Sequence, residues 1–160
     1  MRLIEVLVGL LVVAGCVGSS DAPDGVDLVA HRVFTADHLS DAALRVAFLP
    51  RPERCSPQDL IATRALSQLA EEREDVAVLT VIPAGLPVEA GMDGLPFPGH
   101  VVNLPLHALE EAGRKVERPR LEVYGRDGRL LLLRPVNPWE EERLLVQEVL
   151  GLLRYSPMDG

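Results

Sequence analysis

Runs of apolar residues divide the chain into predicted strands and helices. Leu44–Leu49 and Val76–Ile82 are apolar enough for the middle of a sheet, and the second run is rich in β-branched residues. Leu28–Phe34 is a weaker strand candidate. Because a helix is predicted between the two stronger strands, they form a β-α-β unit, which we expect to be parallel with a right-handed crossover.

The helix of this unit is the clearest element in the sequence. In Ile61–Ala70, apolar residues recur at three- and four-residue spacing, and polar residues occupy the opposite face. The start has the residues of a capped helix: Ser56 as N-cap, Pro57 at the first helical position and Asp59 three residues after the cap. The pattern predicts that the helix ends near Glu74.

The second half of the chain begins with shorter elements. Pro83–Gly99 is rich in proline and glycine and has no period, so it is predicted to be a long loop. His100–Leu104 is a short strand candidate, and Leu106–Ala112 is a short helix that Gly113 stops.

A hairpin and a final helix complete the pattern. Leu121–Tyr124 and Leu130–Leu133 flank the turn sequence Gly-Arg-Asp-Gly, whose Asp-Gly pair is a strong hairpin signal. Pro138–Leu153 is predicted as a helix whose buried side is formed by Leu145, Val149, Leu152 and Leu153. The order of elements predicts an α/β domain with a central mixed sheet flanked by helices.

The beginning of the chain has the pattern of an export signal. A short charged start precedes the apolar run Val6–Gly15, which is shorter than the roughly 20 residues of a membrane-spanning helix. Val13–Cys16 reads Val-Ala-Gly-Cys and resembles the bacterial lipobox, whose cysteine receives a diacylglyceryl group before the preceding peptide is removed. Glu5 departs from the pattern because it cancels the charge of Arg2. A secretory signal without lipid and an uncut anchor helix are the alternatives.

This resemblance divides the chain into three parts. We expect residues 1–15 to be a lipoprotein signal peptide, residues 16–25 a lipidated N-terminus with a flexible tether, and residues 26–155 the folded domain. The resemblance implies a lipid-anchored protein of the bacterial cell envelope, on its periplasmic or extracytoplasmic face, held to the membrane by lipid on Cys16.

Composition limits the partners of the domain. The 160-residue chain has a formal net charge of −8, which argues against a nucleic-acid surface and against electrostatic adhesion to anionic lipid. The chain has two cysteines. If Cys16 carries lipid, Cys55 has no partner for an internal disulfide, so stability must come from packing.

The predicted order of elements resembles the thioredoxin fold over about residues 44 to 153. Cys55 follows the first central strand and precedes the next helix, and an amphipathic helix closes the domain. Arg118–Leu130 is similar to the Thr-Pro-Thr-hydrophobic segment and Asp-Gly hairpin of membrane-anchored thioredoxin-like proteins. The resemblance implies a catalytic site in which Cys55 faces a cis-proline at Pro119, preceded by Arg118.

The sequence departs from the disulfide-exchange motif of this family. Gln58 stands where the second cysteine of Cys-x-x-Cys belongs, and Arg54 replaces the usual tryptophan. If Cys55 were the second cysteine, Pro52 would occupy the first position, and Pro52 also stands where the peroxiredoxin pattern has serine or threonine. A two-cysteine cycle within one mature chain is therefore excluded, whereas a one-cysteine chemistry is not.

Two interpretations of Cys55 stay open. Cys55 precedes a helix N-cap, where the partial positive charge of the helix N-terminus, with Arg51 and Arg54, favours the nucleophilic thiolate. Such a thiolate exchanges with disulfides or is oxidised to sulfenic acid, and an external thiol must resolve the mixed disulfide. In the second interpretation, Cys55 packs against Leu60 as a hydrophobic staple and is inert.

The histidines give little support to a metal site. The copper chaperones of this fold use two cysteines and a histidine, whereas this chain offers Cys55 with His100 or His107, one soft ligand short. We therefore expect neither a metal nor another cofactor.

Two further features of the sequence have structural interpretations. Trp139 is expected to make a core or cap contact at the start of the last helix. The basic residues around Pro119 are expected to form a solvated edge balanced by Glu117 and Glu122, with binding of an anionic partner as the alternative. These basic residues are Arg114, Lys115, Arg118 and Arg120.

The sequence thus predicts a membrane-anchored thioredoxin-like lipoprotein that acts in thiol redox exchange through a single cysteine, Cys55. If the protein is an enzyme, it is a thiol-disulfide oxidoreductase whose partners are thiols or disulfides of other envelope proteins. One alternative is a non-catalytic binding module that kept the fold and lost the cysteine pair. The other is a structural lipoprotein whose loop Pro83–Gly99 contacts another protein.

Overall fold

The structure is a computed structural model that describes residues 41–51, 56–85, 94–111, 113–114 and 117–156. The predicted signal peptide, the tether, the weak strand Leu28–Phe34 and both cysteines, Cys16 and Cys55, lie outside these residues. Among the helices that the structure describes, none is both long enough and apolar enough to cross a bilayer.

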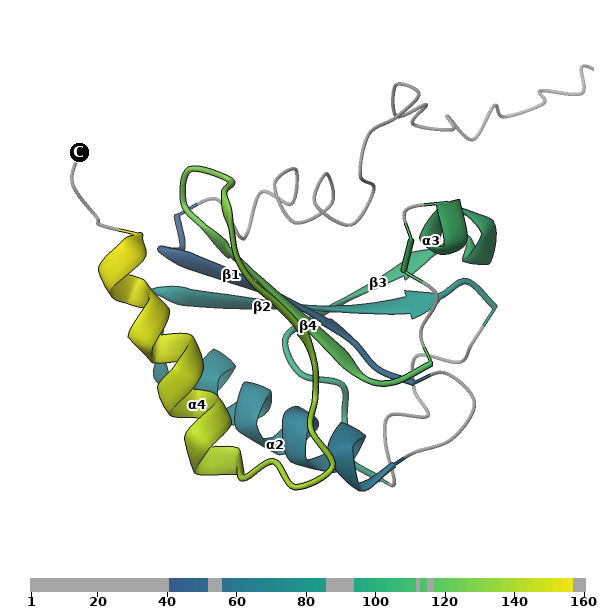
Figure 1. Cartoon of the computed structure of the whole chain (residues 1–160), viewed down its shortest axis with the longest axis horizontal. Helices are drawn as coiled ribbons and strands as arrows, with labels where there is room; N and C mark the ends of the chain where they lie inside the picture. Colours follow the sequence, from purple (N-terminus) through teal and green to yellow (C-terminus); the bar gives the residue numbers. More distant parts are fainter. Residues whose placement is uncertain (1–40, 52–55, 86–93, 112, 115–116, 157–160) are drawn as a thin grey trace, which may run out of the picture.

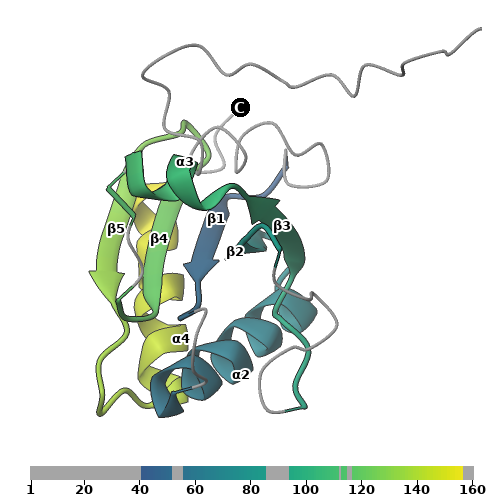
Figure 2. The same ribbon diagram turned by 90° about the vertical axis from the view of Figure 1, so that its right-hand side faces the viewer.

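A five-stranded mixed sheet forms the centre of the described chain, in the order β3-β2-β1-β4-β5. The middle strand β1 (Leu44–Leu49) lies between β2 (Val76–Pro83) and β4 (Arg120–Gly125), as the view of Figure 2 shows after the turn from Figure 1. The edge strands are β3 (His100–Leu104) and β5 (Leu130–Pro135). The pairs β1–β2 and β2–β3 are parallel, whereas β1–β4 and β4–β5 are antiparallel. The parallel β1–β2 pair confirms the predicted β-α-β unit, and the whole arrangement is the expected thioredoxin-like α/β fold.

Helices cover the two faces of the sheet unequally. The helices α2 (Pro57–Glu72) and α4 (Glu142–Gly151) lie together on one face, and the short α3 (Leu106–Glu111) lies on the other (Figures 1 and 2). Because β1 is covered on both faces, all six of its residues are buried, and these include Arg45 as well as the five apolar residues.

Each face of the sheet has its own apolar core. The larger core lies between the sheet and the helices α2 and α4, and its fully buried members include Phe48, Leu66 and Leu121. The smaller core lies under α3 and includes Leu49 and Leu109. The buried Glu122 described below lies on the α3 side, because its neighbours Leu121 and Val123 belong to the larger core.

The start of α2 agrees with the sequence, and its end comes two residues early. The Ser56 hydroxyl accepts from the Asp59 N–H, and the Asp59 carboxylate accepts from the Ser56 N–H, which is a complete capping box. The helix ends at Glu72 because Arg73 adopts an extended conformation. The Arg73 guanidinium donates to Asp75 at 2.8 Å, and this hydrogen bond lowers the pKa of the Asp75 carboxyl.

The predicted hairpin is confirmed. β4 and β5 are joined by a turn in which Gly128 has a φ of 86°, a conformation that favours glycine. The Asp127 carboxylate accepts a hydrogen bond from the Arg129 N–H at 3.0 Å. A bulge between Val123 and Tyr124 shifts the pairing of the two strands.

The last helix begins later than the sequence pattern predicts. α4 starts at Glu142 rather than at Pro138. The preceding residues form a turn in which the Glu140 carboxylate accepts from the Asn137 N–H (3.2 Å) and from the Arg134 guanidinium (2.9 Å). These side-chain contacts replace the first helical turn that the periodicity indicates.

The same turn explains the position of Trp139. The prediction of a core or cap contact is wrong, because the Trp139 side chain is 91% exposed. Leu145 and Val149 are fully buried as predicted, whereas Leu152 and Leu153 are partly buried in a 3-10 turn that follows α4.

Candidate functional site

The residues of the predicted site lie partly outside the described chain. Cys55 is not described, but Arg51 and Ser56, which lie on either side of it, are described. Arg118 and Pro119 are also described. Arg51 and Ser56 are therefore the described residues that lie nearest to the thiol along the chain.

The segments that carry the predicted site leave the sheet at the same end. Leu49, the last residue of β1, pairs with Arg120, the first residue of β4. Arg120 in turn pairs with Pro135, the last residue of β5. Because paired strands are about 4.8 Å apart, the chain that leads from β1 toward Cys55 leaves beside the segment that enters β4.

One buried carboxylate holds the chain on both sides of Cys55. Asp59 is fully buried, and its Oδ1 accepts from the Arg51 backbone N–H at 2.9 Å. Its Oδ2 accepts from the backbone N–H of Ser56 at 2.9 Å and from the Ser56 hydroxyl at 2.5 Å. The sequence predicted Asp59 only as a capping residue. The bond to Arg51, eight residues earlier, also fixes where the Cys55 segment begins.

The predicted cis bond before Pro119 is wrong. All peptide bonds among the described residues are trans, and this includes the bond between Arg118 and Pro119. The trans form is favoured before proline by about 0.5–1 kcal/mol. In the observed conformation, the Pro119 carbonyl accepts a hydrogen bond from the Val136 N–H at 2.8 Å, which continues the β4–β5 pairing by one step.

A buried ion pair lies next to the segment that enters β4. Glu122 is fully buried, and its carboxylate accepts from the Arg114 Nε at 2.7 Å and from the Arg114 Nη2 at 2.9 Å. The Tyr124 hydroxyl donates to the same carboxylate at 2.6 Å, and the Arg120 Nε lies 3.2 Å from Oε1. Charge-assisted, bidentate contacts of this kind compensate for the removal of the charges from water.

The expectation of a solvated edge is therefore only partly right. Glu122 and Arg114 are buried, at 0% and 6% exposed, because their contacts satisfy each other within the protein. Arg118 and Glu117 are exposed, as expected, and Lys115 lies outside the described residues. No signal in the sequence marks Glu122 as buried, since a charged residue at this point of a strand usually faces water.

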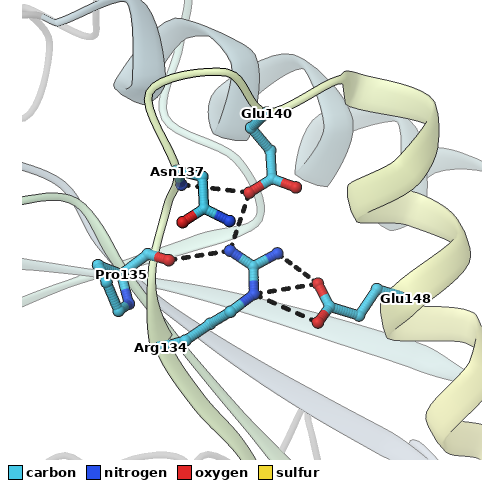
Figure 3. Close-up of polar contacts among 5 residues, drawn as sticks. All are labelled: Arg134, Pro135, Asn137, Glu140 and Glu148. Carbon is cyan, nitrogen blue, oxygen red and sulfur yellow. Dashed lines mark hydrogen bonds and ion pairs between the residues drawn. The ribbon is translucent and has the colours of Figure 1, made fainter.

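A second arginine, Arg134, connects the end of the edge strand β5 to the segments that follow it. The Arg134 guanidinium contacts the carboxylates of Glu140 and Glu148 and the carbonyl of Pro135 (Figure 3). Partial burial disfavours the charge, but the hydrogen bonds to Glu148 and Glu140 outweigh burial and raise the pKa of Arg134. These contacts fix β5 against the turn before α4 and against α4 itself.

A shallow pocket of about 350 Å³ lies between these two arginine clusters. Its lining residues come from the segment before β4, from the start of β4 and from the end of β5. They are Glu117, Arg118, Arg120, Leu133, Arg134 and Pro135. The pocket therefore lies at the end of the sheet from which the Cys55 segment departs.

No cluster of three or more histidine, cysteine, aspartate or glutamate side chains in the described chain has the geometry of a metal site. His100 lies at the start of β3 and His107 lies in α3.

Comparison with known proteins identifies the fold. No protein-family model matches the chain, and no curated protein matches its sequence. Among solved structures, Mycobacterium tuberculosis AhpC is similar with a TM-score of 0.54 and 18% identity, over 78% of this chain and 76% of that one. A secreted M. tuberculosis disulfide oxidoreductase has a TM-score of 0.51 and 16% identity, over 71% and 84% of the two chains.

A third similar structure comes from Streptococcus pneumoniae. This exposed lipoprotein thioredoxin has a TM-score of 0.50 and 19% identity, over 71% of this chain and 87% of that one. At such identities the similarity establishes the fold alone. The described chain thus has a thioredoxin-like fold, of the kind also found in redox proteins.

Proposed function

We propose that this chain is a lipid-anchored, thioredoxin-like protein of the bacterial cell envelope that acts in thiol-disulfide exchange through Cys55. The observation that carries the proposal is the position of Cys55 in the fold. It lies in the connection between β1 and α2, one residue before the N-cap Ser56, and Asp59 holds the chain on both sides of it.

The anchor is proposed from the lipobox-like sequence that ends at Cys16. Two of the structural neighbours are described as a secreted oxidoreductase and an exposed lipoprotein, which supports a location outside the cytoplasm. In this proposal residues 1–15 are removed, residues 16–25 form the lipidated tether, and residues 26–155 form the domain.

The chemistry requires one thiol from this chain and thiols from outside it. The Cys55 thiolate attacks one sulfur of a partner disulfide, so that a mixed disulfide forms and the other partner sulfur leaves as a thiolate. An external thiol, after losing its proton, then attacks the mixed disulfide and joins the partner sulfur. Cys55 leaves as a thiolate and is regenerated. The partner now carries the external thiol in a disulfide, so the original disulfide has been exchanged.

Opposing charges determine how reactive Cys55 is. The N-terminus of α2 and the Arg51 and Arg54 side chains favour the thiolate. The Asp59 carboxylate, in the first turn of the same helix, disfavours the thiolate by charge repulsion. Three hydrogen-bond donors face this carboxylate and weaken its repulsion, so we expect the favourable effects to prevail.

The anchor predicts the result of a fractionation experiment. Because the cysteine receives its lipid before the preceding peptide is removed, Cys16→Ser is expected to keep residues 1–15 and to lack the added mass of the lipid. It is also expected to bind the membrane less, because the acyl chains supply the durable membrane contact. The measurement is immunoblotting of membrane and soluble fractions together with mass spectrometry.

Cys55→Ser is the matched control, since it changes the other cysteine in the same way and is expected to leave the protein membrane-bound. Equal membrane association of the wild type and Cys16→Ser, at unchanged mass, would contradict the anchor.

The second candidate function is a non-catalytic binding module. It is favoured by Gln58, which stands where a second active-site cysteine belongs, and by the buried Asp59 charge. In this case Cys55 is a packing residue of the helix start. Reactivity of the Cys55 thiol distinguishes the two functions.

A further inference from the structure

The pocket beside Pro119 lies in a basic part of an acidic protein. Its lining contains three arginines, Arg118, Arg120 and Arg134, and one carboxylate, Glu117, whereas the whole chain has a net charge of −8. The lining of the pocket is therefore more basic than the chain as a whole.

Two of the arginines that line the pocket are held in place by carboxylates. Arg120 contacts the buried Glu122 at 3.2 Å, and Arg134 contacts Glu140 at 2.9 Å and Glu148 (Figure 3). Fixed side chains lose little conformational entropy when they bind a ligand, so these arginines are organised before binding.

Arg118 differs from these two arginines. It is exposed, and none of the hydrogen bonds or ion pairs found among the described residues involves it. Its guanidinium therefore has donors available for a ligand. A guanidinium binds a carboxylate with two parallel hydrogen bonds.

The walls of the pocket also include exposed apolar surface. Leu133 is 47% exposed at the edge strand β5, and Pro135 beside it is exposed as well. A pocket of about 350 Å³ is large enough for one or two side chains. Its chemistry fits a ligand that combines a carboxylate with neighbouring apolar groups.

We propose that this pocket binds an acidic side chain of a partner peptide, with the carboxylate on Arg118 and Arg120 and neighbouring apolar residues against Leu133 and Pro135. The assignment of that peptide as the exchange partner of Cys55 rests on the proposed function. The binding itself does not depend on the thiol. A peptide is favoured over an anionic bilayer, because a chain of net charge −8 is repelled by anionic lipid.

The proposal predicts selective binding of an acidic peptide by the full-length chain in detergent. The probes are N-acetylated, C-amidated Leu-Glu-Leu and Leu-Gln-Leu, titrated while the backbone amide NMR signals of Arg118, Arg120 and Leu133 are followed. The glutamate peptide is expected to bind about fivefold more tightly. This preference is expected to shrink in high salt, because salt screens exposed charges.

Variants distinguish binding in the pocket from an effect of the overall charge of the protein. Arg118→Gln is expected to remove the preference, and Glu117→Gln, which removes a carboxylate from the pocket, is expected to increase it. Arg143→Gln removes the same charge from an exposed position in α4 outside the pocket and is expected to leave the preference unchanged. Cys55→Ser is also expected to bind normally, so that an inert thiol would contradict the proposed function without contradicting this binding.

Three results would overturn the proposal. They are equal affinity for the two peptides, an equal loss of preference in Arg118→Gln and Arg143→Gln, and binding of phosphatidylglycerol vesicles through Arg118 with no binding of either peptide.

Discussion

Gly99→Ala is expected to lower the free energy of unfolding by about 2–5 kcal/mol. A Cβ at this position would lie 2.1 Å from the carbonyl oxygen of Val78 and 2.8 Å from the Val78 Cβ. The oxygen belongs to the backbone of β2, which pairs with the middle strand β1, so it cannot move without disturbing this pairing. In addition, Gly99 has a φ of 65°, which is unfavourable for any residue with a Cβ.

The close approach at Gly99 ties the end of the long loop to the sheet. Beside it, the Thr80 hydroxyl donates to the Pro98 carbonyl at 2.6 Å in a buried position. Both contacts place the chain for the start of β3 at His100. We therefore expect the alanine variant to lose the alignment of β3 as well as stability.

Gly113→Ala is the matched control for this prediction. Gly113 has nearly the same φ, 69°, but a Cβ at this position would have no atom of the described residues within 4 Å apart from its chain neighbours. Its substitution is therefore expected to cost only the backbone conformation, about 1–2 kcal/mol. Urea denaturation of both variants measures the difference, and equal midpoints would show that the approach to Val78 has no energetic importance.

Glu122→Gln is expected to destabilise the protein by about 3–5 kcal/mol. The substitution keeps the shape of the side chain and removes the negative charge that the Arg114 and Arg120 guanidinium groups face. Because Arg114 is only 6% exposed, water replaces little of this lost interaction. The expected loss of stability is larger than that of one hydrogen bond, because the substitution removes the counter-ion of a buried charge.

The control for Glu122 is a carboxylate of an exposed ion pair. Glu142 lies 3.5 Å from Arg64, and both side chains are largely exposed, so Glu142→Gln is expected to change stability by less than about 1 kcal/mol. The double variant Arg114→Met with Glu122→Gln is expected to recover part of the loss, since it removes the buried cation too. Chemical denaturation measures the stability of these variants. If Glu122→Gln loses no more stability than Glu142→Gln, the buried pair is not important for stability.

The elements that the sequence predicts well are those specified by local chemistry. α2 has its cap residues Ser56 and Asp59 next to an amphipathic pattern, and the hairpin has an Asp-Gly turn between two apolar strands. Each of these signals acts over a few residues, where hydrogen bonds and backbone preferences decide the conformation. These elements in this order, together with the Cys55 and Arg118–Leu130 segments, resemble the thioredoxin fold, and the structure confirms that fold.

The features that the sequence did not reveal depend on contacts between distant residues. The delayed start of α4 results from the contact between Arg134 and Glu140, which a helical period cannot indicate. The burial of Glu122 depends on Arg114, which reaches it from eight residues earlier. The bond from Arg51 to Asp59 likewise becomes visible only when the end of β1 is placed beside the start of α2.

For the site itself, the structure describes the residues around Cys55, whose reactivity stays a prediction. Cys55 was expected just after the first central strand, and the described residues on either side of it lie at the end of β1 and the start of α2. The trans bond at Pro119 was not foreseen, because the expectation came from a family resemblance and not from the residues themselves. Binding of an anionic partner by the basic residues near Pro119 was foreseen only as an alternative to a solvated edge, and the contribution of β5 to the pocket was not foreseen.

The most direct measurement of the central claim is the pH dependence of Cys55 alkylation. In the Cys16→Ser chain, Cys55 is the remaining cysteine, so the rate of reaction with iodoacetamide reports its thiolate alone. We expect a thiol pKa below the free value of about 8.5. We also expect a further decrease in Asp59→Asn, because this substitution removes the opposing charge. A thiol pKa at or above about 8.5 in the otherwise unchanged protein would contradict the proposal that Cys55 is an activated thiol.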